Sequence, residues 1–195
     1  MELTNRQLDI IVASCHIIQA EGVHNLTTKR LAKEMKFSEP ALYRHFKGKA
    51  DILKSIITNA REQMSKNILP HLDINNSGLQ NLQTIINQQI IFVNKNKAIP
   101  IIIFSDLMSQ FNSEVTKTVD DTINMFKLMI EAMIDNGQKD KSIRSDLNKY
   151  QLASIIIGSI RFNILMWRLS DFKIDLIKEG NQLCDTITIL LKPND

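Results

Sequence analysis

Several side chains able to bind phosphates or base edges crowd into twelve residues. The stretch SEPALYRHFKGK (residues 38–49) contains Tyr43, Arg44, His45 and Lys49. Their phenol, guanidinium, imidazole and ammonium groups all donate hydrogen bonds to phosphate oxygens. The window 27–49 holds seven Lys and Arg against two Asp and Glu, a balance of +5, while the whole chain carries only +3. This local excess predicts a polyanionic partner, although a solvated basic helix face would produce a similar imbalance.

Residues for catalysis or metal binding do not cluster in the sequence. His16, His24 and His71 lack metal-ligand spacing, and Cys15 and Cys184 form no C-x-x-C pair. There is no H-E-x-x-H motif, glycine-rich phosphate loop or catalytic-triad spacing. We therefore expect a protein that is not an enzyme and that uses no cofactor and no metal. An enzyme built on a helical bundle is the alternative, and it would need titratable groups gathered around a pocket.

The composition is that of a soluble globular chain in a reducing compartment. Apolar residues make up 44% of the 195 residues and charged residues 23%. The N-terminus MELTNRQLD lacks the apolar region of a signal peptide. The longest mainly apolar runs, such as those at 99–104 and 153–160, are too short to span a bilayer. We expect a cytoplasmic protein without a membrane partner.

Three short elements position the basic stretch. Apolar residues at helical spacing predict a first helix over residues 5–21, with Gly22 as its C-cap. Thr27 or Thr28 begins a second helix that ends near Met35, and Ser38 offers the N-cap of a third over EPALYRHF. Pro40 then lies in the first helical turn, where a missing N–H costs nothing. Two short helices joined by a tight turn form a helix-turn-helix, whose second helix enters the major groove of DNA.

The rest of the chain also has helical periodicity, so the predicted fold class is all-α. A long helix begins near Lys49 and runs towards Lys66. Further helices are predicted over residues 79–96, 99–111, 114–136, 148–169 and 174–191, and Asn136-Gly137 is expected to end one of them.

The stretch from Gly22 to Leu53 resembles the DNA-binding domain of TetR-family transcriptional regulators. The matching residues are Gly22, Leu26, Thr27, Thr28, Leu31, Ala32, Phe37, Ser38, Leu42, Tyr43, His45, Phe46, Lys49 and Leu53. The resemblance implies an N-terminal helix-turn-helix domain, placed at residues 1–48, and a helical effector-binding and dimerisation domain, placed at 49–195. It also implies a homodimeric repressor that binds a palindromic double-stranded DNA operator and is released by a small-molecule effector. A regulator controlled by a protein partner, or without an effector, is the alternative.

The resemblance assigns DNA-contact roles by position. Thr28 and Lys29 are expected to touch the DNA backbone at the start of the second helix. Tyr43, His45 and Lys49 occupy positions that grip phosphates in the family. The positions that read bases are held here by Ser38, Glu39, Pro40, Ala41 and Arg44.

One residue departs from the family pattern. Lys36 stands in the turn where the family usually has glycine. Glycine accepts positive φ freely and lysine does so at a cost, so we expect either some strain in this turn or a slightly different turn angle. Lys36 is also expected to add a phosphate contact.

Met and Phe are frequent in the second half, where they can line an adaptable apolar pocket as well as fill a core. The lining residues we favour for a mostly apolar effector are Phe104, Met108, Met129 and Phe162. Arg161 interrupts an apolar helix and must be paired if buried, with an acidic ligand or, as the preferred alternative, an internal Asp or Glu.

The last two predicted helices are apolar on more than one side, which favours a dimer interface over a wholly internal core. On the final helix the expected seam consists of Leu176, Gly180, Leu183, Ile187 and Leu190.

Overall fold

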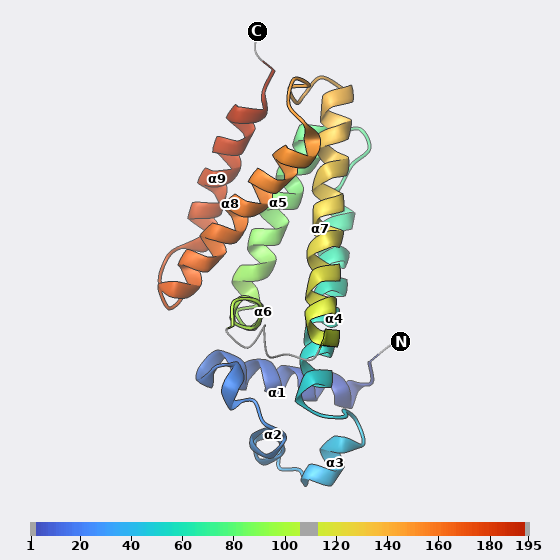
Figure 1. Cartoon of the computed structure of the whole chain (residues 1–195), viewed down its shortest axis with the longest axis vertical. Helices are drawn as coiled ribbons and strands as arrows, with labels where there is room; N and C mark the ends of the chain where they lie inside the picture. Colours follow the sequence, from blue (N-terminus) through green and yellow to red (C-terminus); the bar gives the residue numbers. More distant parts are fainter. Residues whose placement is uncertain (1–2, 106–112, 194–195) are drawn as a thin grey trace. The chain divides into compact units, whose positions relative to one another are not determined.

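The computed structural model describes residues 3–105 and 113–193, and these contain helices and turns but no strand (Figure 1). The predicted all-α fold is confirmed. The α-helices are α1 (Asn5–Glu21), α2 (Thr28–Glu34), α3 (Glu39–Tyr43), α4 (Lys49–Ile68), α5 (Gly78–Lys95), α6 (Ala98–Ile103), α7 (Ser113–Lys139), α8 (Lys149–Leu169) and α9 (Leu176–Leu191). Two 3₁₀ turns, η1 (Val23–Asn25) and η2 (Leu69–His71), complete the described elements.

The helix boundaries follow the capping residues closely. Thr4 forms a capping box with Gln7 at the start of α1, and Gly22 ends that helix with φ 84°. Ser77 caps α5 in the same way, and Asp175 caps α9 through two backbone N–H groups. The predicted starts and ends of α1, α4 and α5 are therefore confirmed to within one or two residues.

Three helix ends were predicted wrongly. The helix predicted over residues 99–111 ends at Ile103. The third helix ends at Tyr43 instead of Phe46, and α7 continues to Lys139 past Asn136-Gly137. A Cβ on Gly137 would lie 2.5 Å from Cδ1 of Ile143, and a Cβ on Gly78 would lie 2.1 Å from the Gly137 nitrogen. The glycine at 137 therefore serves close packing inside the last turns of α7 and does not end the helix.

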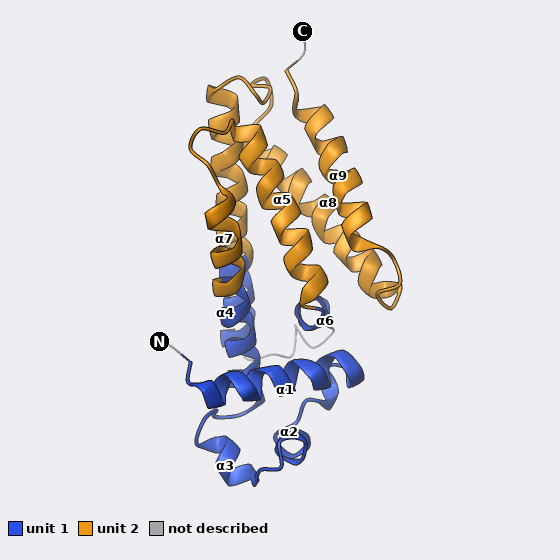
Figure 2. Cartoon of the chain, turned by 180° about the vertical axis from the view of Figure 1, so that it is seen from behind, with its two compact units in different colours: residues 1–61, 97–122 blue, residues 62–96, 123–195 orange. Residues whose placement is uncertain are grey.

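The chain forms two compact units (Figure 2). Unit 1 comprises residues 1–61 and 97–122, and unit 2 comprises residues 62–96 and 123–195. In unit 1, fully buried side chains come from each of the first four helices: Ile10 and Ile18 from α1, Leu31 from α2, Leu42 from α3 and Leu53 from α4. This shared core fixes the short helices α2 and α3, which are too short to be stable alone.

In unit 2, α5 and α9 pack side by side (Figure 2). A Cβ on Gly180 would lie 2.7 Å from Cγ2 of Ile90, so the glycine lets the two helices approach closely. Trp167 is fully buried near the end of α8 and makes an edge-to-face contact with Phe172, with ring centroids 4.7 Å apart. Gly158 of α8, in contrast, is exposed with open space around it.

The outer face of α8 carries an uncovered apolar stripe. Ile155, Phe162, Met166 and Leu169 are exposed large apolar side chains on α8, with the half-buried Ser159 between the first two. Steps of four and three residues place these five positions along one coiled-coil-type seam. We call these five residues the α8 stripe. Phe162 is 61% exposed, so its ring lies on this outer face.

The expected seam on the last helix divides between the core and the surface. Leu176, Gly180 and Ile187 are buried within the chain itself, Ile187 to 6% exposure, so their placement at a dimer surface was wrong. Leu190 is exposed. The residues of α9 that face α5 satisfy the core of unit 2, and only the remaining face is open to a partner.

Within the described residues, α8 is long and apolar enough to cross a membrane, judged by length and composition, with a mean hydropathy of 1.4. Arg161 lies in the middle of the helix, so a count of apolar runs that stops at a charged residue does not detect the whole helix. A single such helix is weak evidence for a membrane span, because helices of soluble proteins pass the same test.

Candidate nucleic-acid interface

The turn between α2 and α3 is closed by backbone hydrogen bonds. The N–H of Phe37 donates to the Ala32 carbonyl at 2.8 Å, and the N–H of Lys36 donates to the Lys33 carbonyl at 3.2 Å. Lys36 has φ 55°, in the left-handed region. The expectation that this position needs positive φ is confirmed, and a lysine there costs about 1–2 kcal/mol relative to its right-handed conformation. Its side chain is exposed.

The first turn of α3 presents a row of small and polar groups. Ser38 is the N-cap with extended backbone, but its hydroxyl caps no backbone N–H of the helix. Pro40 follows in the first turn as predicted. Leu42 is fully buried and fixes the rotation of the helix. The opposite side of α3 therefore leaves the predicted base-reading residues at or near the surface, with Ser38, Pro40 and Arg44 exposed and Glu39 and Ala41 half-buried.

A side-chain contact joins the two helices of the motif. The hydroxyl of Thr28, at the start of α2, donates to the Glu39 carboxylate at 3.2 Å, at the start of α3. A threonine hydroxyl has a single proton to donate. While Thr28 holds Glu39, that proton is not available to a DNA phosphate, and the carboxylate is held in place on the outer side of the motif.

The predicted phosphate-gripping residues lie around the end of α3. Tyr43 is 51% exposed. His45 is half-buried, and its carbonyl accepts a hydrogen bond from the Gln7 amide of α1 at 3.2 Å. The ammonium of Lys49 donates to the carbonyls of Val23 at 2.6 Å and His24 at 3.4 Å. Partial burial lowers the pKa of Lys49. An ammonium has three donors, so one remains for a phosphate.

Comparison with known proteins identifies the motif. Residues 10–56 match the family described as bacterial regulatory proteins of the tetR family. Residues 47–191 match the C-terminal region of YsiA-like proteins, a TetR-type regulatory domain.

The chain belongs to the TetR family. It is a DNA-binding transcriptional regulator with a helix-turn-helix at its N-terminal end.

Individual relatives match along most of the chain. The nucleoid occlusion factor SlmA of Vibrio vulnificus (strain YJ016) is 26% identical over 175 residues, covering 87% of each protein. The fatty acid metabolism regulator protein of Bacillus subtilis (strain 168) is 20% identical over 182 residues, covering 93% of each.

Solved structures show the same fold. The fatty acid degradation regulator FadR from Bacillus halodurans superposes with a TM-score of 0.86 at 16% identity, covering 96% of this chain and 97% of that one. FadR from Bacillus subtilis in complex with stearoyl-CoA superposes with a TM-score of 0.81 at 19% identity, covering 93% and 97%.

Within this TetR-type motif, the basic residues of α2 differ in what they can do. The guanidinium of Arg30 pairs with Glu21 and with Glu34, each at 2.7 Å, and these carboxylates hold its charge. The hydrogen bond from Arg30 lowers the pKa of Glu21. Lys29 and Lys33 are exposed. The Arg30–Glu34 pair is visible in the sequence as an i,i+4 spacing, whereas the Glu21 contact depends on how α1 meets α2.

Two further residues brace the motif and were not singled out from the sequence. The guanidinium of Arg6 lies 4.2 Å from the centre of the Phe37 ring, in the turn between α2 and α3. Gln7, at the start of the same helix α1, binds the end of α3. Neither contact has a local sequence signal, because each joins residues more than thirty positions apart.

The predicted effector-lining residues do not form one described group. Phe104 is half-buried in unit 1, and Met129 and Arg161 are half-buried in unit 2. Phe162 lies on the exposed α8 stripe. Met108 lies outside the described residues.

A buried acid in unit 2 was missed by sequence reasoning. Glu131 of α7 is only 9% exposed, and its Oε1 lies 3.6 Å from the Lys127 ammonium. Oε1 of Glu131 and Oε1 of Gln89 are buried without a hydrogen-bond partner among the residues described. Such atoms are costly unless a ligand or water satisfies them. No group of His, Cys, Asp and Glu within the described ranges is arranged to hold a metal ion.

Proposed function

We propose that this TetR-family protein is a homodimeric repressor that acts in the cytoplasm on a palindromic operator. Residues 1–48 are the DNA-binding part in this proposal, and residues 49–195 bind the effector and form the dimer. The observation that carries the proposal is the first turn of α3. Buried Leu42 directs Ser38, Glu39, Pro40, Ala41 and Arg44 outward from a braced two-helix motif.

The proposed DNA-contacting residues fall into two groups according to the chemistry of their side chains. Lys29, Lys36, Tyr43, His45 and Lys49 supply phosphate contacts, together with Thr28 when its hydroxyl turns away from Glu39. Phosphate contacts give affinity and salt dependence but little sequence preference. The residues of the first turn of α3 contact base edges and give sequence preference. In a dimer the two copies of α3 must match major grooves about 34–36 Å apart.

The α8 stripe supports the homodimer. Four large apolar side chains exposed along one seam are what a self-complementary helix pair covers. Burial of this seam in a partner also gives α8 a role that needs no membrane.

The effector in this proposal is small and mostly apolar. The support is the frequency of Met and Phe in the second half and the names of two similar proteins, a fatty acid metabolism regulator and a FadR bound to stearoyl-CoA. An acyl-chain compound is therefore the first effector to test. The effector acts by favouring a dimer geometry in which the two recognition helices no longer match the operator.

Selection of bound DNA from a random duplex pool, followed by a fluorescence-anisotropy titration, tests the proposal. We expect an inverted-repeat site whose affinity falls steeply with salt and falls further when acyl-CoA is added. Lys49→Ala should lower the salt slope by about one without changing the preferred site. Specific binding that no acyl-CoA alters would favour the alternative of a protein partner or no effector. Failure to select any site would remove sequence-specific binding itself.

A further inference from the structure

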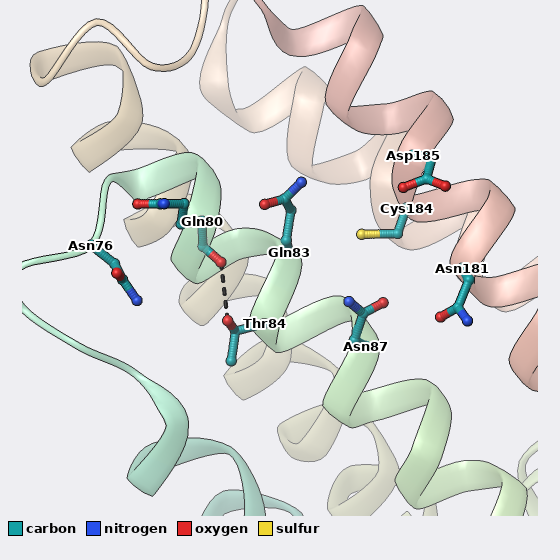
Figure 3. Close-up of a pocket in the computed structure, with 8 residues that line it drawn as sticks. All are labelled: Asn76, Gln80, Gln83, Thr84, Asn87, Asn181, Cys184 and Asp185. Carbon is teal, nitrogen blue, oxygen red and sulfur yellow. Dashed lines mark hydrogen bonds between the residues drawn. The ribbon is translucent and has the colours of Figure 1, made fainter.

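Unit 2 contains a polar pocket that the DNA-binding function does not use. It lies between α5 and α9 beside the loop that precedes α5, and has a volume of about 570 Å³ (Figure 3). Its lining consists of Asn76, Gln80, Gln83, Thr84, Asn87, Asn181, Cys184 and Asp185. Seven of these eight side chains carry an amide, hydroxyl or carboxylate, so the pocket differs in kind from an apolar effector cavity.

One wall of the pocket is an uncharged polar stripe on α5. Gln80, Gln83, Thr84 and Asn87 follow each other at steps of three, one and three residues and share one helix face. In the sequence of α5, GLQNLQTIINQQIIFVNK, the only charged residue is the last. Solvent-facing helix surfaces usually carry ion pairs and charges. A face made of amides and one hydroxyl can both donate and accept hydrogen bonds at each step.

Part of this hydrogen-bonding capacity is already used inside the protein. The Gln83 amide nitrogen donates to the Thr188 hydroxyl at 2.9 Å, which ties α5 to α9 across the pocket. The side-chain Oε1 of Gln80 accepts a hydrogen bond from the Ser77 N–H. The Thr84 hydroxyl donates to the backbone carbonyl of Gln80, as Figure 3 shows. These contacts fix the side chains at the upper end of the stripe.

Asn87 is different. Its Oδ1 is buried and has no hydrogen-bond partner within the part of the chain that the structure describes. Leaving a buried carbonyl unsatisfied costs about 1–3 kcal/mol. This oxygen is closed to solvent, so a ligand donor reaches it when the Asn87 side chain turns towards the pocket. That contact removes the cost and makes Asn87 the anchor for a bound molecule.

The charges around the pocket restrict the ligand. Asp185 is the only ionisable oxygen acid in the lining, and no Lys, Arg or His lines it, so a phosphate or carboxylate finds no counter-ion. An ammonium ligand would pair with Asp185 but could accept nothing from the amide N–H groups of Gln80, Asn87 and Asn181. Burial raises the pKa of the Cys184 thiol to about 11, so the sulfur is neutral. Hydroxyl groups, which donate and accept, match this lining.

We propose that the α5–α9 pocket binds a small, uncharged polyhydroxylated molecule, such as a sugar or polyol, with a ligand hydroxyl donating to Oδ1 of Asn87. This site is additional to the proposed apolar effector and does not depend on DNA binding. Because the ligand contacts both α5 and α9, its binding stabilises unit 2 and raises the melting temperature in proportion to occupancy.

Isothermal titration calorimetry of the full chain tests the proposal with named probes. The neutral probes are glucose, galactose, ribose and mannitol, and the charged comparisons are glucose 6-phosphate and putrescine. We expect at least one neutral probe to bind with a Kd below about 1 mM and both charged compounds to bind at least about tenfold more weakly. No binding of any neutral probe up to about 10 mM, or preferred binding of a charged compound, overturns the proposal.

Variants locate the binding. Asn87→Leu should weaken binding of the neutral probe at least about tenfold. Asp185→Ala, an exposed change that leaves the fold intact, should weaken binding of the same probe about two- to fivefold. Gln88→Leu is the matched control, because Gln88 is also on α5 but does not line the pocket. The helical circular dichroism and the melting temperature of each variant, measured without ligand, report correct folding. Equal affinity of the probe for Asn87→Leu and the unchanged chain would exclude this pocket.

Discussion

Lys36 holds a backbone conformation that glycine adopts without strain, and this makes the turn of the motif a place to gain stability. The left-handed conformation costs a side-chain-bearing residue about 1–2 kcal/mol, while glycine loses about 0.5–1 kcal/mol more in chain entropy. We expect Lys36→Gly to raise the free energy of unfolding by about 0.5–1 kcal/mol, measured by urea denaturation.

Lys36→Ala is the matched control for that prediction. It removes the same charge but keeps the side-chain Cβ, so its stability should stay near that of the unchanged chain. Both variants should lose the same increment of DNA affinity at low salt, since both lose one proposed phosphate contact. Equal stability of Lys36→Gly and Lys36→Ala would show that the positive φ stores no strain.

Glu39 and Thr28 give a second residue-scale prediction. An ionised carboxylate only accepts hydrogen bonds, and the base edge that offers it a donor in the major groove is typically the cytosine N4 amino group. Glutamine instead pairs with adenine through two bonds. We expect Glu39→Gln to move the preferred base at one symmetric operator position from cytosine to adenine, with a discrimination of about 1–3 kcal/mol in a competition binding assay.

The contact between the two side chains refines this test. Thr28→Val removes the hydroxyl that holds the Glu39 carboxylate and should relax the preference at the same operator position. Glu34→Gln, which removes an equal charge from a carboxylate already bound by Arg30, should leave the preference unchanged. A Glu39→Gln protein that keeps the original base preference would show that this carboxylate does not read the operator.

At the scale of elements, local signals located most helices and tertiary contacts decided the remainder. Thr4, Gly22, Ser77 and Asp175 lie at helix ends and satisfy backbone groups locally, so α1, α5 and the start of α9 could be placed from the sequence. The end of α3 could not, because the Gln7 amide of another helix binds the His45 carbonyl there.

In the candidate DNA interface, too, some features follow from the local sequence and others depend on tertiary contacts. The proline start of α3 follows from residue type. Positive φ at Lys36 follows from the family resemblance, since glycine usually holds that position. Two contacts depend on the packing of α1, α2 and α4, which no local sequence pattern encodes. These are the hydrogen bond from Lys49 to the Val23 carbonyl and the ion pair between Arg30 and Glu21. Sequence could therefore propose the interface residues but could not separate exposed basic side chains from those that already have a structural partner.

The connection between α7 and α8 carries a pH-dependent contact. Asp135 of α7 pairs with Lys139 and with Lys149, at the start of α8, and these ammonium groups lower its pKa from 3.8 to about 2. A depressed carboxyl pKa adds stability above the unfolded pKa, and this is lost as the pH falls through the folded value. We expect the unchanged chain to lose stability between about pH 4 and pH 2 more steeply than Asp135→Asn.

Urea denaturation at a series of pH values measures this difference. Other paired carboxylates, such as Asp146 beside Arg144, titrate in both proteins and cancel in the comparison. Asp120→Asn, an exposed change on the same helix α7, is the control and should follow the unchanged chain. Parallel pH profiles for the unchanged chain and Asp135→Asn would show that the pair is fully screened by water.

At the scale of the whole molecule, the exposed α8 stripe predicts how the dimer can be broken. Phe162 is 61% exposed in the single chain, so a charge there disturbs no core but would be buried unpaired in a dimer. We expect Phe162→Glu to give a folded monomer at micromolar concentration by sedimentation velocity, with unchanged helical circular dichroism. Operator affinity should fall sharply, because one protomer contacts only half a site.

Two further variants make the dimer test specific. Ile74→Glu places the same charge on a loop residue that is 98% exposed and should leave the dimer intact. Ile187→Asp, by contrast, strikes the core of unit 2 and should unfold the protein, so it cannot report on the interface. A Phe162→Glu protein that stays dimeric would remove the α8 stripe from the interface.

In the proposed mechanism, release from DNA is a property of the whole dimer, and thermodynamic linkage constrains it. An effector that favours the non-binding geometry by about 2–3 kcal/mol lowers operator affinity about 30- to 150-fold. Thermodynamic reciprocity then requires saturating operator to weaken effector binding by the same factor. We expect calorimetric titrations of a long-chain acyl-CoA into free protein and into the operator complex to differ by that factor. Coenzyme A without an acyl chain is the control and should bind weakly in both cases, since it buries no apolar chain. Equal acyl-CoA affinity with and without operator would mean that the acyl-CoA binds but does not release the protein from DNA.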